Sequence, residues 1–265
     1  MRSDPGFRHL SRLEKRVRDF YVRTIRPFLG TPLAQQRVKL VWDAWGYYPL
    51  LANTTIPTRE RLGLIVRMLR IDWNVPHAHK PRELVAVLSS IAERPARDGE
   101  SVVEAGCWMG GSTAKLSVFC QRFGYALHTY DSFEGVEGRT SIEGSGTDFS
   151  GSYAAALDIV RANVARYGEA SVCHYHKGWF ADTLAKSPPE FPVRGGYIDC
   201  DLVKGTSEAL SGLIPTLVDD GWIYSQDYHI TSVRELLHSS ELWERVGKAL
   251  PRIDHVYRNL ARLTV

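Results

Sequence analysis

Three aspartates follow two stretches of sequence that have the character of buried strands. Asp199 and Asp201 come directly after one stretch, and Asp227 comes after the next. Neighbouring parallel strands end side by side, so we expect the three carboxylates to converge. Three carboxylates cannot all stay charged at close range without a compensating cation, and a hard cation such as Mg²⁺ prefers oxygen ligands. The spacing therefore predicts a magnesium site, which could lower the pKa of a bound hydroxyl. Loop acids that cap local backbone are the alternative.

A glycine-rich turn, Glu-Ala-Gly-Cys-Trp-Met-Gly-Gly-Ser, runs from Glu104 to Ser112 between a predicted strand and a predicted helix. Gly106 would let a ligand approach the backbone, and the helix start offers free N–H groups. The spacing Gly-x-x-x-Gly-Gly differs from the dinucleotide pattern Gly-x-Gly-x-x-Gly. It favours a nucleoside without phosphate, such as S-adenosylmethionine, whose carboxylate would meet the helix. A plain strand-to-helix connection is the alternative.

Two more residues have side chains suited to this chemistry. Asp131 ends the second predicted strand, where an acid can accept hydrogen bonds from both ribose hydroxyls. His229 lies two residues after Asp227 and has an ordinary pKa suited to a general base or hydrogen-bond donor. A loop-capping role for Asp131 and a solvated loop position for His229 are the alternatives.

Alternating strands and helices must position these residues. Residues 96–265 are expected to form a Rossmann-like catalytic domain, an α/β doubly wound, mostly parallel seven-stranded sheet, and residues 1–95 an N-terminal helical accessory segment. A Gly- and Ser-rich loop, 135–152, is expected to close over the ligands. The predicted strands are 101–105, 126–130, 171–176, 195–199, 221–225, 253–257 and 260–265. The predicted helices are 9–28, 59–71, 81–93, 112–124, 153–167, 180–186, 205–218 and 231–248.

Several motifs in the same order resemble the macrocin O-methyltransferase family. They are Glu104–Ser112, Tyr130–Gly135 (Tyr-Asp-Ser-Phe-Glu-Gly), Lys177–Leu184 (Lys-Gly-Trp-Phe-Ala-Asp-Thr-Leu), Asp199–Asp201 and Gln226–Tyr228. The resemblance implies a fold of class I methyltransferase type. It also implies S-adenosylmethionine as methyl donor, S-adenosylhomocysteine as product, a sugar or glycoside hydroxyl as acceptor, and a divalent cation in many members.

The resemblance also assigns roles to individual residues. Asp199 and Asp227 would be metal ligands, with Gln226 beside them, and Asp201 would be the general base, for which His229 is the other candidate. The donor pocket would be formed by Glu104, Gly106, Ser112, Asp131, Ser132, Gly178 and Trp179.

Two positions depart from the family pattern. The family usually has a second acid directly before Asp227, where this chain has Gln226. An amide oxygen can still bind a cation, but one negative charge is lost. The chain also has Leu-Val-Lys-Gly-Thr at 202–206, where the family commonly has Leu-Tyr-Glu-Ser-Thr, so the acceptor contacts of the family do not carry over directly.

Composition and charge limit the class of protein. The 265 residues carry a net charge of +3 and are 44% hydrophobic, which excludes a disordered chain. No apolar run could span a bilayer, the N-terminus lacks a secretory h-region, and the four cysteines lack metal-ligand spacing. We therefore predict a cytoplasmic protein with reduced thiols and no transmembrane segment.

The charge is unevenly distributed. Residues 1–40 contain ten basic and three acidic residues, a net charge of +7, which leaves −4 for the other 225 residues. The apolar stripe of this basic segment is expected to pack on the core or on another subunit, so we predict a homo-oligomer. Binding to an anionic membrane, an anionic acceptor or nucleic acid is the alternative, although no nucleic-acid module is evident and we predict no such partner.

The sequence thus predicts an S-adenosylmethionine-dependent O-methyltransferase of a sugar hydroxyl, assisted by Mg²⁺. Three other functions remain open. They are a nicotinamide oxidoreductase, whose glycine spacing does not fit, a metal-dependent methyltransferase of phenolic hydroxyls, and a non-catalytic binding protein on a degenerate methyltransferase fold, to which Gln226 gives weight.

Overall fold

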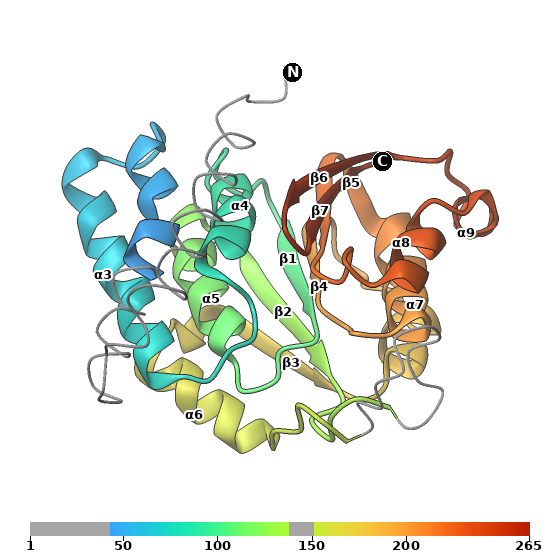
Figure 1. Ribbon diagram of the computed structural model, residues 1–265, viewed down its shortest axis with the longest axis horizontal. Helices are drawn as coiled ribbons and strands as arrows, with labels where there is room; N and C mark the ends of the chain where they lie inside the picture. The colour runs from blue at the N-terminus through green and yellow to red at the C-terminus, as the bar shows by residue number, and fades with distance from the viewer. Residues whose placement is uncertain (1–42, 138–150) are drawn as a thin grey trace, which may run out of the picture.

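A computed structural model describes residues 43–137 and 151–265 of the chain (Figure 1). The whole basic segment 1–40, which contains the predicted helix 9–28, and residues 138–150 of the predicted loop 135–152 lie outside the described residues. Within the described residues, no helix is both long and apolar enough to cross a membrane. The four cysteines are all free, as predicted.

A seven-stranded sheet forms the centre of the molecule, in the strand order β3-β2-β1-β4-β5-β7-β6. The first five of these strands are parallel, and β7 runs antiparallel to both β5 and β6. This arrangement confirms the predicted mostly parallel, doubly wound sheet with a terminal hairpin. The strands are β1 (Ser101–Ala105), β2 (Ala126–Asp131), β3 (Cys173–Lys177), β4 (Val193–Ile198), β5 (Leu217–Ser225), β6 (Arg252–Tyr257) and β7 (Leu260–Thr264).

Helices cover both faces of the sheet (Figure 1). One group is α3 (Thr58–Asn74), α4 (Pro81–Ile91), α5 (Gly111–Phe123) and α6 (Leu157–Tyr167), and the other is α7 (Val203–Leu213), α8 (Thr231–Leu237) and α9 (Ser240–Arg245). Each group buries its own hydrophobic core, and consecutive residues of β1 point into opposite cores: Val102 into the first, Val103 into the second. Short helical turns complete the chain: η3 (Tyr48–Ala52), η4 (Ala170–Val172), η5 (Ala181–Ala185) and η6 (Ile214–Thr216).

Three predicted helices differ most from the structure. The predicted helix 231–248 is two helices, because Ser239 is extended and the Trp243 indole donates to the last carbonyls of α8, at Leu237 (2.8 Å). The predicted helix 205–218 ends earlier, where Pro215 lacks the N–H that an α-helix needs, and β5 begins directly afterwards. The predicted helix 153–167 starts only at Leu157, because Tyr153 has a left-handed backbone (φ 58°).

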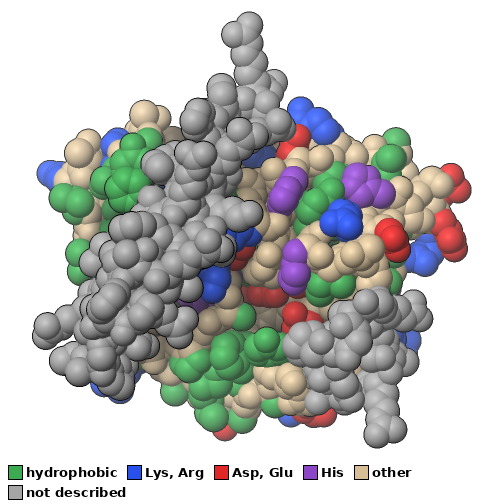
Figure 2. All heavy atoms as spheres, in the orientation of Figure 1, with side chains coloured by type: hydrophobic (Ala, Val, Ile, Leu, Met, Phe, Trp, Pro, Cys, Tyr) green, Lys and Arg blue, Asp and Glu red, His purple; other side chains and the backbone are tan. Residues whose placement is uncertain are grey.

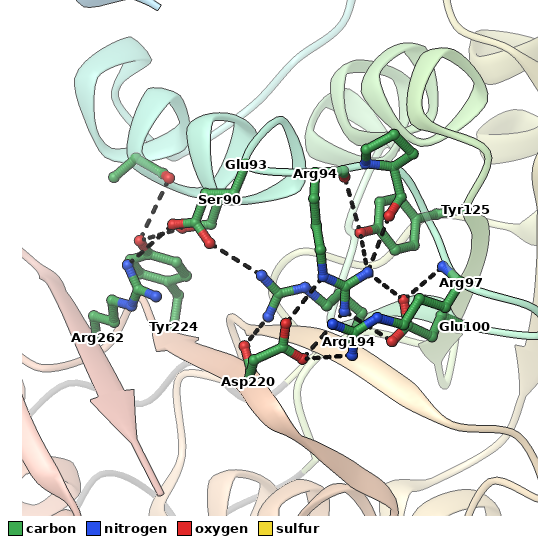
Figure 3. A network of polar contacts seen from close by, with 12 residues as sticks. Ser90, Glu93, Arg94, Arg97, Glu100, Tyr125, Arg194, Asp220, Tyr224 and Arg262 are labelled. Atoms are coloured by element: carbon green, nitrogen blue, oxygen red, sulfur yellow. Dashed lines mark hydrogen bonds and ion pairs between the residues drawn. The ribbon is translucent and has the colours of Figure 1, made fainter. Parts of the chain in front are cut away.

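An ion-pair network closes the amino ends of the strands, far from the strand ends that carry the predicted site (Figure 3). Arg94, just after α4, pairs with Glu100 before β1 (2.6 Å) and with Asp220 on β5 (2.9 Å). Arg194 on β4 pairs with Glu93 (3.0 Å). The pairing lowers the pKa of the Glu100 carboxyl, because Arg94 donates to it. The network holds the end of α4 against the sheet. Its central residue, Arg94, is paired with two acids, Glu100 and Asp220.

Candidate functional site

A cavity of about 470 Å³ opens at the carboxyl ends of the parallel strands. It lies where β1 has β2 on one side and β4 on the other, the switch point at which ligands bind in open α/β sheets. Figure 2 shows acidic side chains recessed on this face, with histidines beside them. Ten predicted site residues line the cavity: Gly106, Ser112, Asp131, Ser132, Gly178, Trp179, Asp199, Asp201, Gln226 and His229.

The glycine turn brings the residues that follow β1 next to those that follow β4. Gly106 has a left-handed backbone (φ 88°), and a Cβ at this position would overlap the backbone carbonyl oxygen of Asp199. The Asp199 N–H donates in turn to the Ala105 carbonyl (2.9 Å). Only glycine allows this close approach, so the turn brings the end of β1 against the residues that follow β4.

Asp131 supports the turn from the end of β2. Its two carboxylate oxygens accept hydrogen bonds from the backbone N–H groups of Cys107 (2.8 Å) and Phe133 (2.7 Å). Its own carbonyl accepts from the Gly178 N–H (3.0 Å). The carboxylate is therefore held in one orientation at the cavity wall, with lone pairs left for a ligand.

Glu104 is fully buried beneath the turn and is not among the residues that line the cavity. One carboxylate oxygen accepts from the hydroxyls of Thr113 (2.6 Å) and Thr129 (3.2 Å), and the other has no hydrogen-bond partner in residues 43–137 and 151–265. Burial raises the pKa of Glu104 to about 7. Its predicted role in cofactor binding stays a prediction.

The three predicted aspartates do converge, with one carboxylate oxygen from each of Asp199, Asp201 and Asp227 within 4.8 Å of the others. Asp227 Oδ2 accepts the backbone N–H groups of Cys200 (2.9 Å) and Asp201 (2.8 Å), which ties the end of β5 to the end of β4. Among the described residues, Asp227 Oδ1 is buried without a hydrogen-bond partner. A buried, unpartnered carboxylate oxygen in a group of three close carboxylates fits a cation.

The electrostatics of the cluster also favour a cation. Burial, followed by the charge of Asp201, raises the pKa of Asp227 to about 7. Burial and the charges of Asp227 and Asp201 raise the pKa of Asp199 well above its ordinary value. Burial raises the pKa of Asp201 as well, while the nearby His229 opposes that shift. A positive charge among these groups would stabilise their ionised forms.

Several cavity-lining residues were not selected by sequence analysis. Tyr153 lines the cavity, and its ring stands edge-on to Trp108 (5.3 Å between centroids). Burial, followed by the charges of the three aspartates, raises the pKa of its phenol. No sequence signal marked Tyr153, since only the fold brings the segment before α6 to the cavity.

A buried polar cluster forms a further part of the wall. His77 and His79, from the connection between α3 and α4, line the cavity. His77 Nε2 lies 3.2 Å from Asp72 Oδ1, and His79 Nε2 lies 2.8 Å from Lys115 Nζ. Lys115 also pairs with Asp72, and both are buried. The backbone at Gly111 packs against His77, so the cluster connects α3 to the start of α5.

The fold and the site define a protein of the α/β methyltransferase class. The structure is similar to that of the O-methyltransferase NovP, with a TM-score of 0.58 and 19% identity over 71% of this chain and 82% of NovP. It is also similar to CalS11, a calicheamicin methyltransferase, with a TM-score of 0.53 and 14% identity over 89% of this chain and 93% of CalS11. At these identities the likeness is one of fold.

Sequence comparison identifies the family. Residues 82–258 match the macrocin-O-methyltransferase (TylF) family, and the chain belongs to it. A relative from Streptomyces olivaceus, 8-demethyl-8-(2,3-dimethoxy-α-L-rhamnosyl)-tetracenomycin-C 4′-O-methyltransferase, is 30% identical over 202 residues, which are 71% of this chain and 77% of the relative. These matches confirm the resemblance and the prediction of an S-adenosylmethionine-dependent O-methyltransferase.

Proposed function

We propose that the protein methylates a hydroxyl group of a sugar or glycoside, with the help of Mg²⁺. The observation that carries the proposal is the convergence of three carboxylates: Asp199 and Asp201 line the cavity, and Asp227 is buried next to them, with one oxygen that has no hydrogen-bond partner among the described residues. The name of the S. olivaceus relative, which describes a rhamnosyl-bearing acceptor methylated at a 4′ oxygen, supports the sugar class.

The donor would lie along the glycine turn. Asp131 would accept hydrogen bonds from the ribose hydroxyls, and the N–H groups at Gly111 and Ser112 would face the methionine carboxylate. Trp179 and Gly178 would border the adenosine, together with Ser132. This arrangement would point the sulfonium methyl toward the aspartates on the other side of the turn.

The transfer is an in-line displacement, in which the acceptor oxygen forms a bond to the methyl carbon as the carbon–sulfur bond breaks. The products are a methyl ether and S-adenosylhomocysteine. Asp201, or His229 beside it, would take the hydroxyl proton. The protein contributes mainly alignment of the two reactants and exclusion of water.

Asp199, Asp201 and Asp227 fit a divalent cation, and Gln226 offers an amide next to them. When bound, the cation would hold acceptor hydroxyls and lower the pKa of the one to be methylated. Asp199 and Asp227 would be its ligands and hold it in place, while Asp201 remains free to accept the proton.

A product assay tests the proposal. Chelator-treated protein is incubated with S-adenosylmethionine and a panel of rhamnosides, other glycosides and catechols, with and without Mg²⁺, and products are identified by mass spectrometry. We expect methylated glycosides only when Mg²⁺ is added, and Asp227→Asn should abolish the response to Mg²⁺. Full activity after exhaustive chelation would overturn the metal assistance, and methylation of catechols alone would overturn the sugar class.

We also propose a cellular location, an oligomeric state and a partner class for the enzyme. The free cysteines support a cytoplasmic location, and the apolar stripe predicted in residues 9–28 supports a homo-oligomer. The acidic cavity makes nucleic acid an unsuitable partner. Sedimentation equilibrium would show the number of subunits.

A further inference from the structure

Glu83 is a fully buried acid in the first turn of α4 that reaches three segments of the chain. Its Oε2 accepts the backbone N–H of Lys80 (2.7 Å) and the side-chain Nε2 of Gln226 (3.4 Å). Its Oε1 accepts the backbone N–H of Asn259, in the turn between β6 and β7 (3.4 Å). Gln226 and Asn259 both line the cavity. The acid therefore connects α4 to two parts of the cavity wall.

The charge of Glu83 also acts on two of the three aspartates, Asp199 and Asp227. Burial is the main reason that the pKa of Asp199 is raised, after which the charges of the other aspartates and of Glu83 add to the shift. The charge of Glu83 likewise adds to the raised pKa of Asp227, again after burial. The carboxylate of Glu83 is thus a fourth negative group that acts on the cluster. It comes from α4, whereas the aspartates follow strands.

The contact with Glu83 fixes the orientation of the Gln226 amide. An amide is planar, with its NH₂ donor and its carbonyl acceptor on the same carbon, so holding one group directs the other. Glu83 accepts from Nε2, and within the described parts of the chain Oε1 of Gln226 accepts no hydrogen bond. The Gln226 N–H donates to the Ile198 carbonyl (2.9 Å), which holds its backbone beside the end of β4.

These contacts explain why a glutamine suits position 226. A second acid there would place two carboxylates against each other in a buried setting, which is unfavourable. Glutamine instead donates to Glu83 and keeps a neutral oxygen for the cavity.

We propose that Glu83 is a positioning residue of the metal centre: it orients the carbonyl oxygen of Gln226 toward the cavity and supplies a negative charge beside this neutral side chain. This inference rests on the proposed metal assistance. If the inference holds, one of the residues 83 and 226 must carry a negative charge, and either of them can do so.

A charge-exchange experiment tests this pairing in the full-length protein without methyl donor. Mn²⁺ affinity is measured by electron paramagnetic resonance, and the melting temperature is measured with chelator, for wild type, Glu83→Gln, Gln226→Glu and the double variant. Loss of a residue that orients a metal ligand weakens metal binding about 10- to 100-fold, and we expect that loss for Glu83→Gln. Gln226→Glu should lower the metal-free melting temperature, because two buried carboxylates then face each other. The double variant should recover Mn²⁺ affinity, with donor and acceptor exchanged. Its melting temperature should stay below that of wild type, because a glutamine at position 83 has only one acceptor oxygen for the Lys80 and Asn259 N–H groups that the two oxygens of Glu83 accept.

Glu93→Gln is the matched control. Glu93 follows α4 at its other end, where it pairs with Arg194, so its loss should reduce stability without changing Mn²⁺ affinity. If folded Glu83→Gln binds Mn²⁺ as wild type does, or if the double variant fails to recover Mn²⁺ binding, Glu83 only caps α4 and the inference is wrong. If wild-type protein binds no Mn²⁺, the proposed metal assistance itself fails.

Discussion

At the residue scale, the site contains acids in which only one of the two carboxylate oxygens accepts a hydrogen bond from the described residues. Glu104 and Asp227 each have one oxygen hydrogen-bonded to the protein and one buried without a partner. An unsatisfied buried acceptor costs free energy unless a proton, a cation or a ligand donor reaches it. The ligand-free protein should therefore respond strongly to pH and to ligands at these positions.

The first prediction concerns the pH dependence of stability at Glu104. Its pKa is about 7 in the folded protein and 4.5 in the unfolded chain. Because the folded pKa is raised, the protonated acid's contribution is complete below pH 4.5 and is lost as the pH rises through 7, by about 3 kcal/mol at most. Glu104→Gln should therefore be more stable than wild type at pH 8, and the gain should disappear near pH 5.

Urea unfolding with chelator at several pH values measures this difference. The aspartates titrate in both proteins, so the comparison reports the titration of Glu104 together with its coupling to Asp131 and Asp199. An equal effect of Glu104→Gln on stability at pH 5 and pH 8 would contradict the raised pKa.

The second prediction distinguishes the two candidate bases. Asp201 has a left-handed backbone (φ 59°), which asparagine tolerates well, so Asp201→Asn should fold normally. Loss of a general base lowers kcat about 10²- to 10⁴-fold, and we expect that loss for Asp201→Asn but a much smaller one for His229→Gln. Steady-state kinetics measures kcat, and unchanged S-adenosylhomocysteine affinity confirms that the donor site is intact. The reverse order of effects would assign the base to His229.

The sequence predicted site residues that follow from their place at the end of a strand. It did not predict residues that reach the site only through contacts with distant segments of the chain. Asp199, Asp201 and Asp227 follow buried strands, so their convergence could be inferred from strand adjacency. Glu83 has the pattern of an ordinary first-turn helix acid, and only the fold brings it to Gln226. His77 likewise reaches the cavity through packing between helices.

At the scale of elements, the ends of β1 and β4 meet with no room for a side chain. Gly106 is the reason, because its backbone lies directly against the Asp199 carbonyl. The position of the glycine turn relative to the aspartates therefore depends on one residue without a Cβ. The strand positions were predictable from runs of buried residues, whereas helix bounds were less so, because Trp243 and Pro215 end or divide helices that their apolar spacing would continue.

The third prediction is that Gly106→Ala destabilises the protein by about 2 kcal/mol or more, because alanine disfavours the left-handed backbone and its Cβ overlaps Asp199. Gly63→Ala is the matched control: nothing lies within 4 Å of a Cβ there, inside α3, so it should stabilise the protein by about 0.5–1 kcal/mol. Urea unfolding measures both. Equal effects would show that the close approach at Gly106 has no energetic importance.

At the scale of the whole molecule, the chain separates an N-terminal basic segment from the residues that carry the chemistry. The family match begins at residue 82, and every predicted site residue lies beyond it. The first hydrophobic core nevertheless includes residues of α3 and α4 as well as α5. A division of the chain at 95/96 stays a prediction, since these helices share one core with the sheet.

The fourth prediction concerns residues 1–30, which carry eight of the ten basic residues of the segment 1–40. A protein without them should fold and bind S-adenosylhomocysteine with unchanged affinity, because the described cavity lining begins at Pro76. We expect the truncation to change the oligomeric state or the KM for acceptor instead. Calorimetry and size-exclusion chromatography measure these properties. A folded truncated protein that no longer binds S-adenosylhomocysteine would show that the segment completes the donor site.

The ion-pair network at the amino ends of the strands has a consequence for local motion. Arg94, Glu100 and Asp220 already satisfy one another there, whereas the carboxyl ends hold Asp227 with an open oxygen. The two ends of the same sheet should therefore exchange amide hydrogens at different rates, slowly at the network and faster at the cavity. Binding of ligands should slow amide exchange only at the cavity end. The amino ends of the strands would then stay rigid throughout, while the carboxyl ends become ordered when ligands bind.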